Sequence, residues 1–373
     1  MRQTLLNHIK NIPGRRIKRK LVVISVDDYG NVRLDSRKAR ETLNRAGMKI
    51  HSRFDAYDSL ETREDLEALF ETLTAVKDQN NRPAIFTPFT LPCNINFEKV
   101  AEQGFERYHY ETLPDTYTKL EARDAQAYSG AWRLWREGIE NGLMKPQFHG
   151  REHLNLKVFE EKLAQKDKEV LTALKNRSYT SISNSGYPTI GWTAAFAFDT
   201  LEDIRKFPSI VKTGMDAFED VFGFRSESFT PPAQQFPLQL ERTLSDYGIR
   251  HLDKPFIRKR HLGGGKYRRE VNVMERERAT GLNILVRNVV FEPTNGQVDH
   301  IGKAMQQVKA AFRMHKPAII SSHRVNFCGH IDPQNRERGL NALKTLLQKI
   351  VRTWPEVEFI SASELGSIIA AKE

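Results

Sequence analysis

The chain has 373 residues, 39% of them hydrophobic, so it can bury the core of one large α/β domain or of two ordinary ones. Lys and Arg outnumber Asp and Glu by 58 to 47, and this net charge of +11 favours anionic partners such as an acidic glycan, nucleic acid or an anionic membrane. No nucleic-acid-binding module accompanies the charge, and the two cysteines exclude a disulfide framework. We therefore expect a protein that binds no nucleic acid. No apolar stretch approaches the roughly 18 residues of a membrane span, so we also expect a cytoplasmic location.

Strand-like and helix-like segments alternate along the chain without a linker or a change in composition. Strands are predicted at residues 21–26, 84–87, 145–148, 228–230, 249–252, 282–291, 318–322 and 357–361. Helices are predicted at residues 36–45, 63–76, 156–163, 209–221, 238–247, 297–312, 336–352 and from 363 onward. Residues 94–145 resemble an insertion with its own helices, 178–206 a long loop or second insertion, and 258–269 a basic Gly-rich loop. The alternation predicts one α/β domain over residues 1–373 with a parallel sheet that is closed or nearly closed.

Two adjacent acids, Asp27 and Asp28, end the first predicted strand. Neighbouring carboxylates repel each other and are costly to desolvate, so such a pair at the end of a buried strand calls for a balancing charge. A divalent cation could bind one carboxylate and leave the other to move protons. An ordinary polar turn is the structural alternative.

His149 and His153 stand at positions i and i+4, a spacing that on a helix or helical turn points both imidazoles toward one ion. Two histidines on the surface of a helix would give the same pattern. Together with one of the aspartates they would form a two-imidazole, one-carboxylate site with open positions for water, which suits Zn²⁺. His323, which follows another buried strand, is placed to protonate a leaving group. In a parallel barrel these strand ends share one face, where active sites form.

These residues resemble the motifs of the polysaccharide deacetylases of the NodB-homology type (carbohydrate esterase family 4). Residues 25–30, Ser-Val-Asp-Asp-Tyr-Gly, are similar to the Thr-Phe-Asp-Asp-Gly-like first motif, with one residue added before the glycine. Residues 149–153 match the His-(Ser/Thr)-x-x-His motif, with Gly150 in place of the hydroxyl residue. Residues 320–323, Ile-Ser-Ser-His, resemble the apolar strand ending in Leu-x-His.

Two further motifs depart from the family pattern. Residues 229–233, Phe-Thr-Pro-Pro-Ala, resemble the Arg-Pro-Pro-Tyr-Gly-like motif, but Thr230 replaces the arginine that orients the base. The resemblance implies that Pro231 and Pro232 contact substrate, and Arg225 is the candidate replacement for the arginine. Asp253 is the best candidate for the aspartate of the fourth motif.

The resemblance implies a distorted (β/α) barrel of the glycoside hydrolase/deacetylase type, with insertions. It implies Asp27 as general base, Asp28, His149 and His153 as metal ligands, and His323 as general acid. The implied activity is metal-dependent removal of an N- or O-acetyl group from a sugar, with Zn²⁺ as the expected metal. The substrate would be a carbohydrate, with an anionic glycan or glycolipid as a variant. Two alternatives remain open: a related barrel hydrolase acting on another amide or a glycosidic bond, and a non-catalytic binder of anionic glycan.

Overall fold

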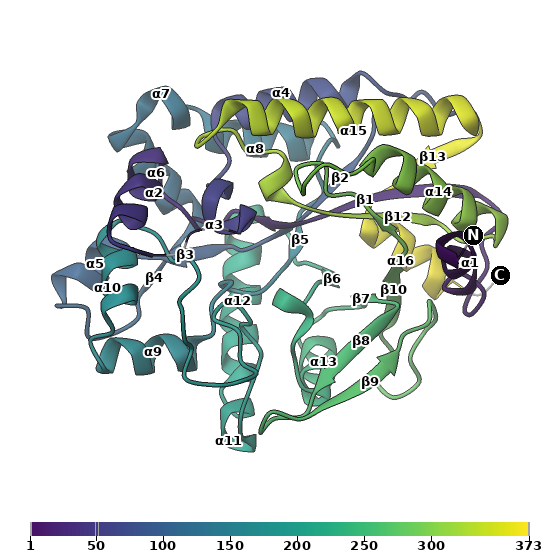
Figure 1. Ribbon diagram of the computed structural model, residues 1–373. Helices are drawn as coiled ribbons and strands as arrows, with labels where there is room; N and C mark the ends of the chain where they lie inside the picture. The colour runs from purple at the N-terminus through teal and green to yellow at the C-terminus, as the bar shows by residue number, and fades with distance from the viewer. Residues whose placement is uncertain (1, 49, 51, 372–373) are drawn as a thin grey trace.

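A computed structural model describes residues 2–48, 50 and 52–371 of the chain, with side chains from residue 6 onward. A nine-stranded sheet forms its centre (Figure 1). The strand order is β10 (Asn283–Arg287), β7 (His251–Pro255), β6 (Ser228–Phe229), β5 (Gln147–Phe148), β2 (Phe86–Thr90), β1 (Lys20–Tyr29), β12 (Ala318–His323) and β11 (Val289–Val290), with β13 (Val357–Phe359) also paired to β1. Every pairing of this sheet among the described residues is parallel.

The two ends of the sheet are consecutive in the chain. β10 pairs with β7, and β11, one residue later, pairs with β12 on the other side. The residue between them, Asn288, is 2% exposed, and its amide donates to the Pro317 carbonyl and the Asn11 side chain, both at 2.8 Å. Its side-chain oxygen accepts the Ile319 N–H at 2.9 Å, so no polar group is left unpaired where the strand changes partner. The sheet is therefore a nearly closed, distorted (β/α) barrel, and the predicted fold class is confirmed.

Helices cover both faces of the curled sheet (Figure 1). They are α1 (Arg2–Ile9), α2 (Arg37–Arg45), α3 (Arg53–Tyr57), α4 (Arg63–Thr74), α5 (Phe97–Glu102), α6 (Leu113–Arg123), α7 (Ala125–Tyr128), α8 (Ala131–Glu140), α9 (Leu156–Ala164), α10 (Lys168–Lys175), α11 (Leu201–Ile204), α12 (Phe207–Phe222), α13 (Leu238–Asp246), α14 (His300–Arg313), α15 (Pro333–Thr353) and α16 (Ala362–Ala370). None of the described helices is both long and apolar enough to cross a membrane.

Alternate residues of β1 enter two separate apolar clusters, as the two-residue period of a strand requires. Val22, Ile24 and Val26 pack with leucines of α4 and α15, while Leu21 and Val23 pack with apolar residues of α12, α13 and α16. Figure 1 shows α4, α8 and α15 above the sheet and α12 and α13 below it. Because both faces of the strand are buried, its apolar run is continuous in the sequence.

Three predicted elements differ from the structure. Residues 258–269 form a β-hairpin, not a loop: β8 (Ile257–His261) and β9 (Tyr267–Val271) pair across the glycines of residues 263–265. Strand β2 runs through Pro88 to Thr90, because Pro88 lies where the register with β1 shifts and a missing N–H is tolerated. Within residues 94–145, β4 (Tyr110–Thr112) pairs with β3 (Cys93–Ile95) beside the expected helices.

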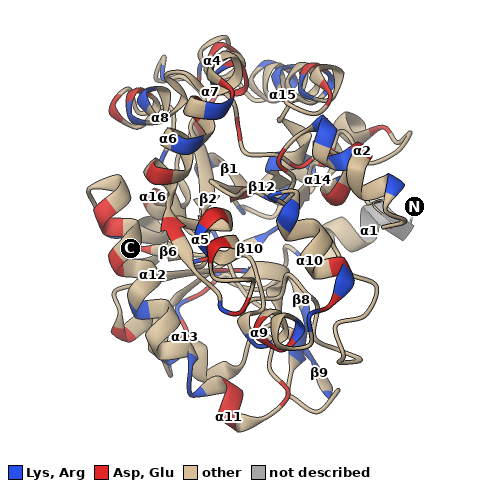
Figure 2. Cartoon of the chain, turned by 90° about the vertical axis from the view of Figure 1, so that its left-hand side faces the viewer, with Lys and Arg blue, Asp and Glu red and all other residues tan. Residues whose placement is uncertain are grey.

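In the view of Figure 2, basic and acidic residues are interspersed over the helices, so this side carries no single basic face.

Candidate metal centre and catalytic cluster

Both acids of β1 line one cavity of about 220 Å³, although adjacent residues of a regular strand point to opposite faces. The register between β1 and β2 shifts after Val26, and Asp28 adopts a left-handed backbone conformation with φ of 76°. Such a conformation is strained for a residue other than glycine and is typical of functional sites. The irregularity brings Asp27 and Asp28 to the same side of the barrel end.

The cavity collects side chains from several strand ends and their following loops. Its lining residues are Asp27, Asp28, Arg33, Phe54, His149, His153, Thr193, Pro231, Ala233, Gln234 and His323. Asp27 and His323 face each other in the register of β1 and β12. Thus the structure brings together all of the predicted catalytic and metal-ligating residues.

Asp28, His149 and His153 form a group that could hold one metal ion. The Asp28 Oδ1 atom lies 3.3 Å from His149 Nε2 and 3.2 Å from His153 Nε2. Two ligand atoms about 2.0–2.2 Å from a tetrahedral ion are about 3.4 Å apart, so these distances are those of a coordination edge. All three residues are buried.

The hydrogen bonds around this group also fit a metal. The Nδ1 atom of His149 lies 2.6 Å from the Thr230 carbonyl, which can only accept, so Nδ1 carries the proton and Nε2 keeps its lone pair. Both His149 Nε2 and Asp28 Oδ1 are buried without a hydrogen-bond partner. Unpaired buried acceptors are costly, and a cation at this point would satisfy both.

The two histidines lie on an irregular loop after β5, not on the helix or helical turn for which their spacing was considered. Gly150 has φ of 112°, a conformation that favours glycine, and a Cβ there would lie 3.4 Å from Pro232 Cγ. Aromatic residues of the 94–145 segment brace this loop. Tyr108 donates to Glu152 at 2.9 Å, and the Arg151 guanidinium lies 4.4 Å from the Tyr110 ring centroid. The 94–145 segment therefore supports the loop that carries His149 and His153. Neither Tyr108 nor Tyr110 lines the cavity.

Asp27 is held by Arg287 of β10. The guanidinium donates to Asp27 Oδ1 at 2.6 Å and to Oδ2 at 2.7 Å, and its Nε donates to Asp253 at 2.7 Å. Thr230 accepts a further bond from Arg287 at 2.9 Å. Burial raises the pKa of Asp27, but the charge and hydrogen bonds of Arg287, with contributions from His149 and His323, together lower it more, so the carboxyl pKa lies below its usual value. Asp27 is therefore an ionised, oriented acceptor.

Arg225 does not take this role, contrary to our expectation. It precedes β6 and so lies at the opposite end of the barrel from the cavity. There its guanidinium binds Glu219 at 2.7 Å and the Tyr247 carbonyl at 3.0 Å. Of the other two predicted substrate contacts, Pro231 lines the cavity, whereas Pro232 packs near Gly150. The Asp253 carboxylate does not line the cavity and is linked to Asp27 through Arg287.

His323 is polarised by a carboxylate that the sequence analysis missed. Its Nδ1 lies 2.6 Å from Glu292 Oε1, so Nδ1 carries a proton and Nε2 points toward Asp27, 4.0 Å away. Burial lowers the pKa of His323, but Glu292 and the two aspartates raise it to about 9. Arg53 and Asn326 bind the second oxygen of Glu292, at 2.6 and 2.7 Å. His323 is thus a proton donor at neutral pH.

Of the two missed residues, Arg287 lies inside the predicted apolar segment 282–291 and Glu292 directly follows it. Glu292 carries the same signal that marked Asp27 and His323, a polar residue where an apolar segment ends, whereas only the structure shows that a strand ends at Arg287. Their contacts with Asp27 and His323 span 260 and 31 residues of sequence, so only the fold shows which acid and which histidine they serve.

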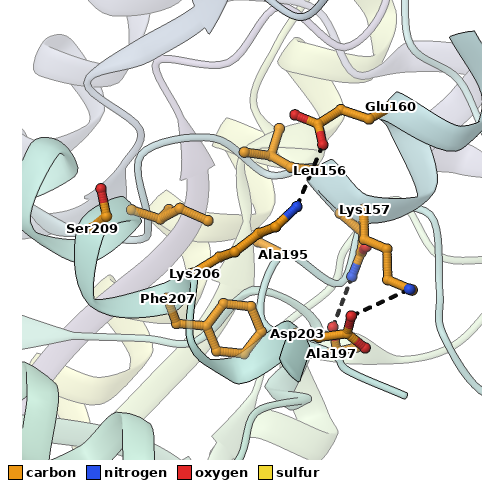
Figure 3. Close-up of a pocket in the computed structure, with 11 residues that line it drawn as sticks. Leu156, Lys157, Glu160, Ala195, Ala197, Asp203, Lys206, Phe207 and Ser209 are labelled. Carbon is orange, nitrogen blue, oxygen red and sulfur yellow. Dashed lines mark hydrogen bonds and ion pairs between the residues drawn. The ribbon is translucent and has the colours of Figure 1, made fainter. Parts of the chain in front are cut away.

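A second cavity, of about 290 Å³, lies between α9 and α12 and shares no lining residue with the first (Figure 3). Its charged side chains are paired with each other: Lys157 with Asp203 at 3.2 Å, and Lys206 with Glu160 at 3.7 Å. The Asn155 amide donates to the Ala194 and Ala197 carbonyls. The charged lining groups are thus paired with each other, whereas the ligand set, Asp27 and His323 line the first cavity, which is therefore the candidate site.

No protein-family model matches the chain, and no curated protein is significantly similar to it. Among solved structures, a Mycobacterium smegmatis protein provisionally assigned as a polysaccharide deacetylase is 13% identical, with 96% of this chain and 94% of that one covered and a TM-score of 0.45. A branching enzyme of glycoside hydrolase family 57 from Thermococcus kodakaraensis is 10% identical, with 96% and 72% covered and a TM-score of 0.45. A family 4 acetyl xylan esterase from Clostridium thermocellum, solved with cobalt, is 10% identical, with 94% and 91% covered and a TM-score of 0.35. At these TM-scores the similarities carry no functional argument.

Proposed function

We propose that this protein is a metal-dependent hydrolase that removes an N- or O-acetyl group from a sugar. The observation that carries the proposal is the arrangement of three functions around one cavity. Asp28, His149 and His153 form a ligand set, Asp27 is an ionised carboxylate held by Arg287, and His323 is a protonated imidazole opposite it. Hydrolysis of an acyl group needs these three parts: activation of water, a base and an acid.

A divalent ion such as Zn²⁺, when bound, acidifies water and withdraws electron density from a carbonyl oxygen. The protein supplies the proton transfers. Asp27 accepts the proton of the attacking water: its lowered pKa keeps it ionised, and the two hydrogen bonds from Arg287 hold it in place. His323 Nε2 then donates a proton to the departing amine or alcohol oxygen, while Glu292 stabilises the imidazolium.

The protonation states argue against glycosidic hydrolysis by a carboxylate pair. That reaction needs one carboxylic acid kept protonated near the scissile bond. The pKa values of Asp27 and Asp28 both lie below their usual value despite burial, because Arg287 opposes burial at Asp27 and the interactions with His149 and His153 oppose it at Asp28, so neither is such an acid. Burial raises the pKa of Asp253 to about 6, but Arg287 stands between it and Asp27.

Acetate release tests the proposal. The protein, purified without added metal, is assayed on N- and O-acetylated sugars after loading with Zn²⁺ and after treatment with a chelator. We expect acetate from the loaded protein, none after chelation, and recovery when the ion is restored. Acetate release that is indifferent to chelation, or release of reducing sugar instead of acetate, would contradict the proposal.

A further inference from the structure

Arg33 is a cavity residue that the proposed catalytic steps do not use. It follows β1 by four residues, is 7% exposed, and lines the cavity together with Asp28 and His153. Its guanidinium makes no hydrogen bond to a described residue, and its Nε is buried without a partner. A buried arginine cannot lose its proton, so this is a permanent charge with unused donors.

The other arginines near the cavity are neutralised. Arg287 is hydrogen-bonded to Asp27 and Asp253, and Arg53 lies 2.6 Å from Glu292. Arg33 is also ion-paired, through Nη2 with Asp55 Oδ1, but at 3.5 Å this contact is longer and is not a hydrogen bond. Asp55 Oδ1 instead accepts the Ser181 N–H at 2.9 Å and the Ser181 hydroxyl at 3.1 Å.

Two other carboxylates act on Arg33 from further away, Asp58 and Asp28. Arg324 binds Asp58 through Nε at 2.9 Å and Nη2 at 2.8 Å, so that charge is taken. Asp28 is faced by the two imidazoles and would be neutralised by the ion it is placed to hold. Arg33 therefore shares its charge with Asp55, but its Nε and the other guanidinium donors that bond to no described residue remain available to a ligand in the cavity.

The position of Arg33 is fixed before any ligand arrives. Its carbonyl accepts the Tyr179 N–H at 3.0 Å, which ties its backbone to the loop after α10. Its guanidinium lies 5.2 Å from the centroid of the Phe54 ring, another cavity residue. A pre-positioned planar guanidinium is suited to bind a carboxylate or phosphate with two parallel hydrogen bonds.

We propose that Arg33 binds an anionic group of the substrate, a carboxylate or a phosphate, so that the acetylated sugar is an acidic one. This inference rests on the proposed function, because it identifies the substrate class of the same site. Arg33 is a substrate-binding group and takes no part in the proton transfers.

Three related sugars test this inference: N-acetylglucosamine, its 6-phosphate, and the uronic acid with a carboxylate at the same carbon. Monosaccharides suit a cavity of about 220 Å³. Acetate release is measured for the Zn²⁺-loaded wild type, Arg33→Gln and Arg33→Lys. Arg40→Gln is the matched control, because Arg40 lies 5.7 Å from the Tyr57 ring centroid in the same region and does not line the cavity. Calorimetry of the three sugars on an Asp27→Asn background reports binding without turnover.

We expect the wild type and the control to prefer at least one anionic sugar over the neutral one by roughly 10- to 100-fold in kcat/KM, the usual effect of one charge-assisted contact. Arg33→Gln should lose this preference, Arg33→Lys should keep part of it, and Arg40→Gln should keep both the preference and the wild-type rates. The phosphate and carboxylate probes show which anion is preferred.

Acetate release with no preference for charge, or a preference that survives in Arg33→Gln, would overturn the inference and leave the proposed function intact. Binding of the anionic sugars that depends on Arg33, without any acetate release, would contradict the proposed function and support the anion site. If neither anionic sugar binds, the inference is wrong.

Discussion

Arg287 and Asp27 form a two-bond ion pair, with donor–acceptor distances of 2.6 and 2.7 Å, although 260 residues separate them in the sequence. Arg287 ends β10, at one end of the strand order, and Asp27 is near the end of β1, close to the other end. The ion pair therefore spans the gap at which the sheet closes into a barrel. Closure of the barrel and orientation of the proposed base therefore depend on the same strand.

Replacement of Arg287 should lower activity and leave metal binding intact. In Arg287→Gln, Asp27 loses the donors that orient it, and we expect kcat to fall at least about 100-fold, as for a misplaced catalytic group. None of the three metal ligands bonds to Arg287, so the Zn²⁺ content should stay at the wild-type level. Arg287→Lys keeps the positive charge but lacks the planar guanidinium, so its kcat should lie between those of the wild type and Arg287→Gln. Loss of metal in either variant, with the fold retained by circular dichroism, would argue against a separate role for Arg287.

The acid limb of the pH profile should move in the Arg287→Gln variant. Arg287 holds the pKa of Asp27 below its usual value against the effect of burial. Without that charge, burial raises the pKa, so the residual activity should be lost at a higher pH than in the wild type as the solution is acidified. A pH profile of kcat/KM for both proteins measures this shift. An unchanged acid limb would remove Asp27 from the role of base.

Glu292 should control the alkaline limb. The pKa of His323 is raised to about 9 by Glu292 and the aspartates, so a required protonated imidazole is present through neutral pH and is lost as the pH rises through about 9. In Glu292→Gln this pKa should fall toward or below the ordinary value of 6.5, because burial then dominates. The alkaline limb of kcat should move to lower pH by the same amount. His323→Gln should abolish the limb together with most of the activity.

Most of the fold was predictable because each strand buried on both faces leaves a continuous apolar run, as residues 21–24 do. The site residues were predictable for a related reason: charged or imidazole side chains directly after such runs, as at Asp27 and His323, have few structural uses. Which side chains of the site contact one another was not predictable. Thr230 suggested that the base lacks an arginine, whereas its hydroxyl instead accepts a hydrogen bond from Arg287, which arrives from a different strand. Arg33 gave no signal at all, because an arginine in a loop is ordinary until its partners are seen.

Gly150 should be needed for the metal centre. Alanine at φ of 112° is strained, and its Cβ would be in contact with Pro232 Cγ and the Glu152 carbonyl oxygen, both 3.4 Å away, so the loop between the two histidine ligands has little room to relieve the strain. We expect Gly150→Ala to weaken Zn²⁺ binding about 10-fold or more, as measured by competition with a chromophoric chelator. Gly142→Ala is the matched control, since Gly142 has φ of 69° with nothing within 4 Å of an added Cβ. Equal Zn²⁺ affinity in the two variants would show that the loop around Gly150 adapts to the added methyl group.

Metal removal should lower stability, and the effect should separate the two aspartates. In the apo protein the buried Asp28 Oδ1 has no hydrogen bond, and only two imidazoles face it. A bound ion would provide a partner for this oxygen. A free ion concentration of 100 times Kd adds about 2.7 kcal/mol to the free energy of unfolding. Calorimetric melting with and without Zn²⁺ should therefore show a rise of several degrees in wild type and in Asp27→Asn, because Asp27 is not in the ligand set. Asp28→Asn should show little or no rise and no activity, whereas Asp27→Asn should keep the rise and lose turnover. If instead Asp27→Asn abolishes the rise and Asp28→Asn retains it, the assignment of ligand and base is reversed.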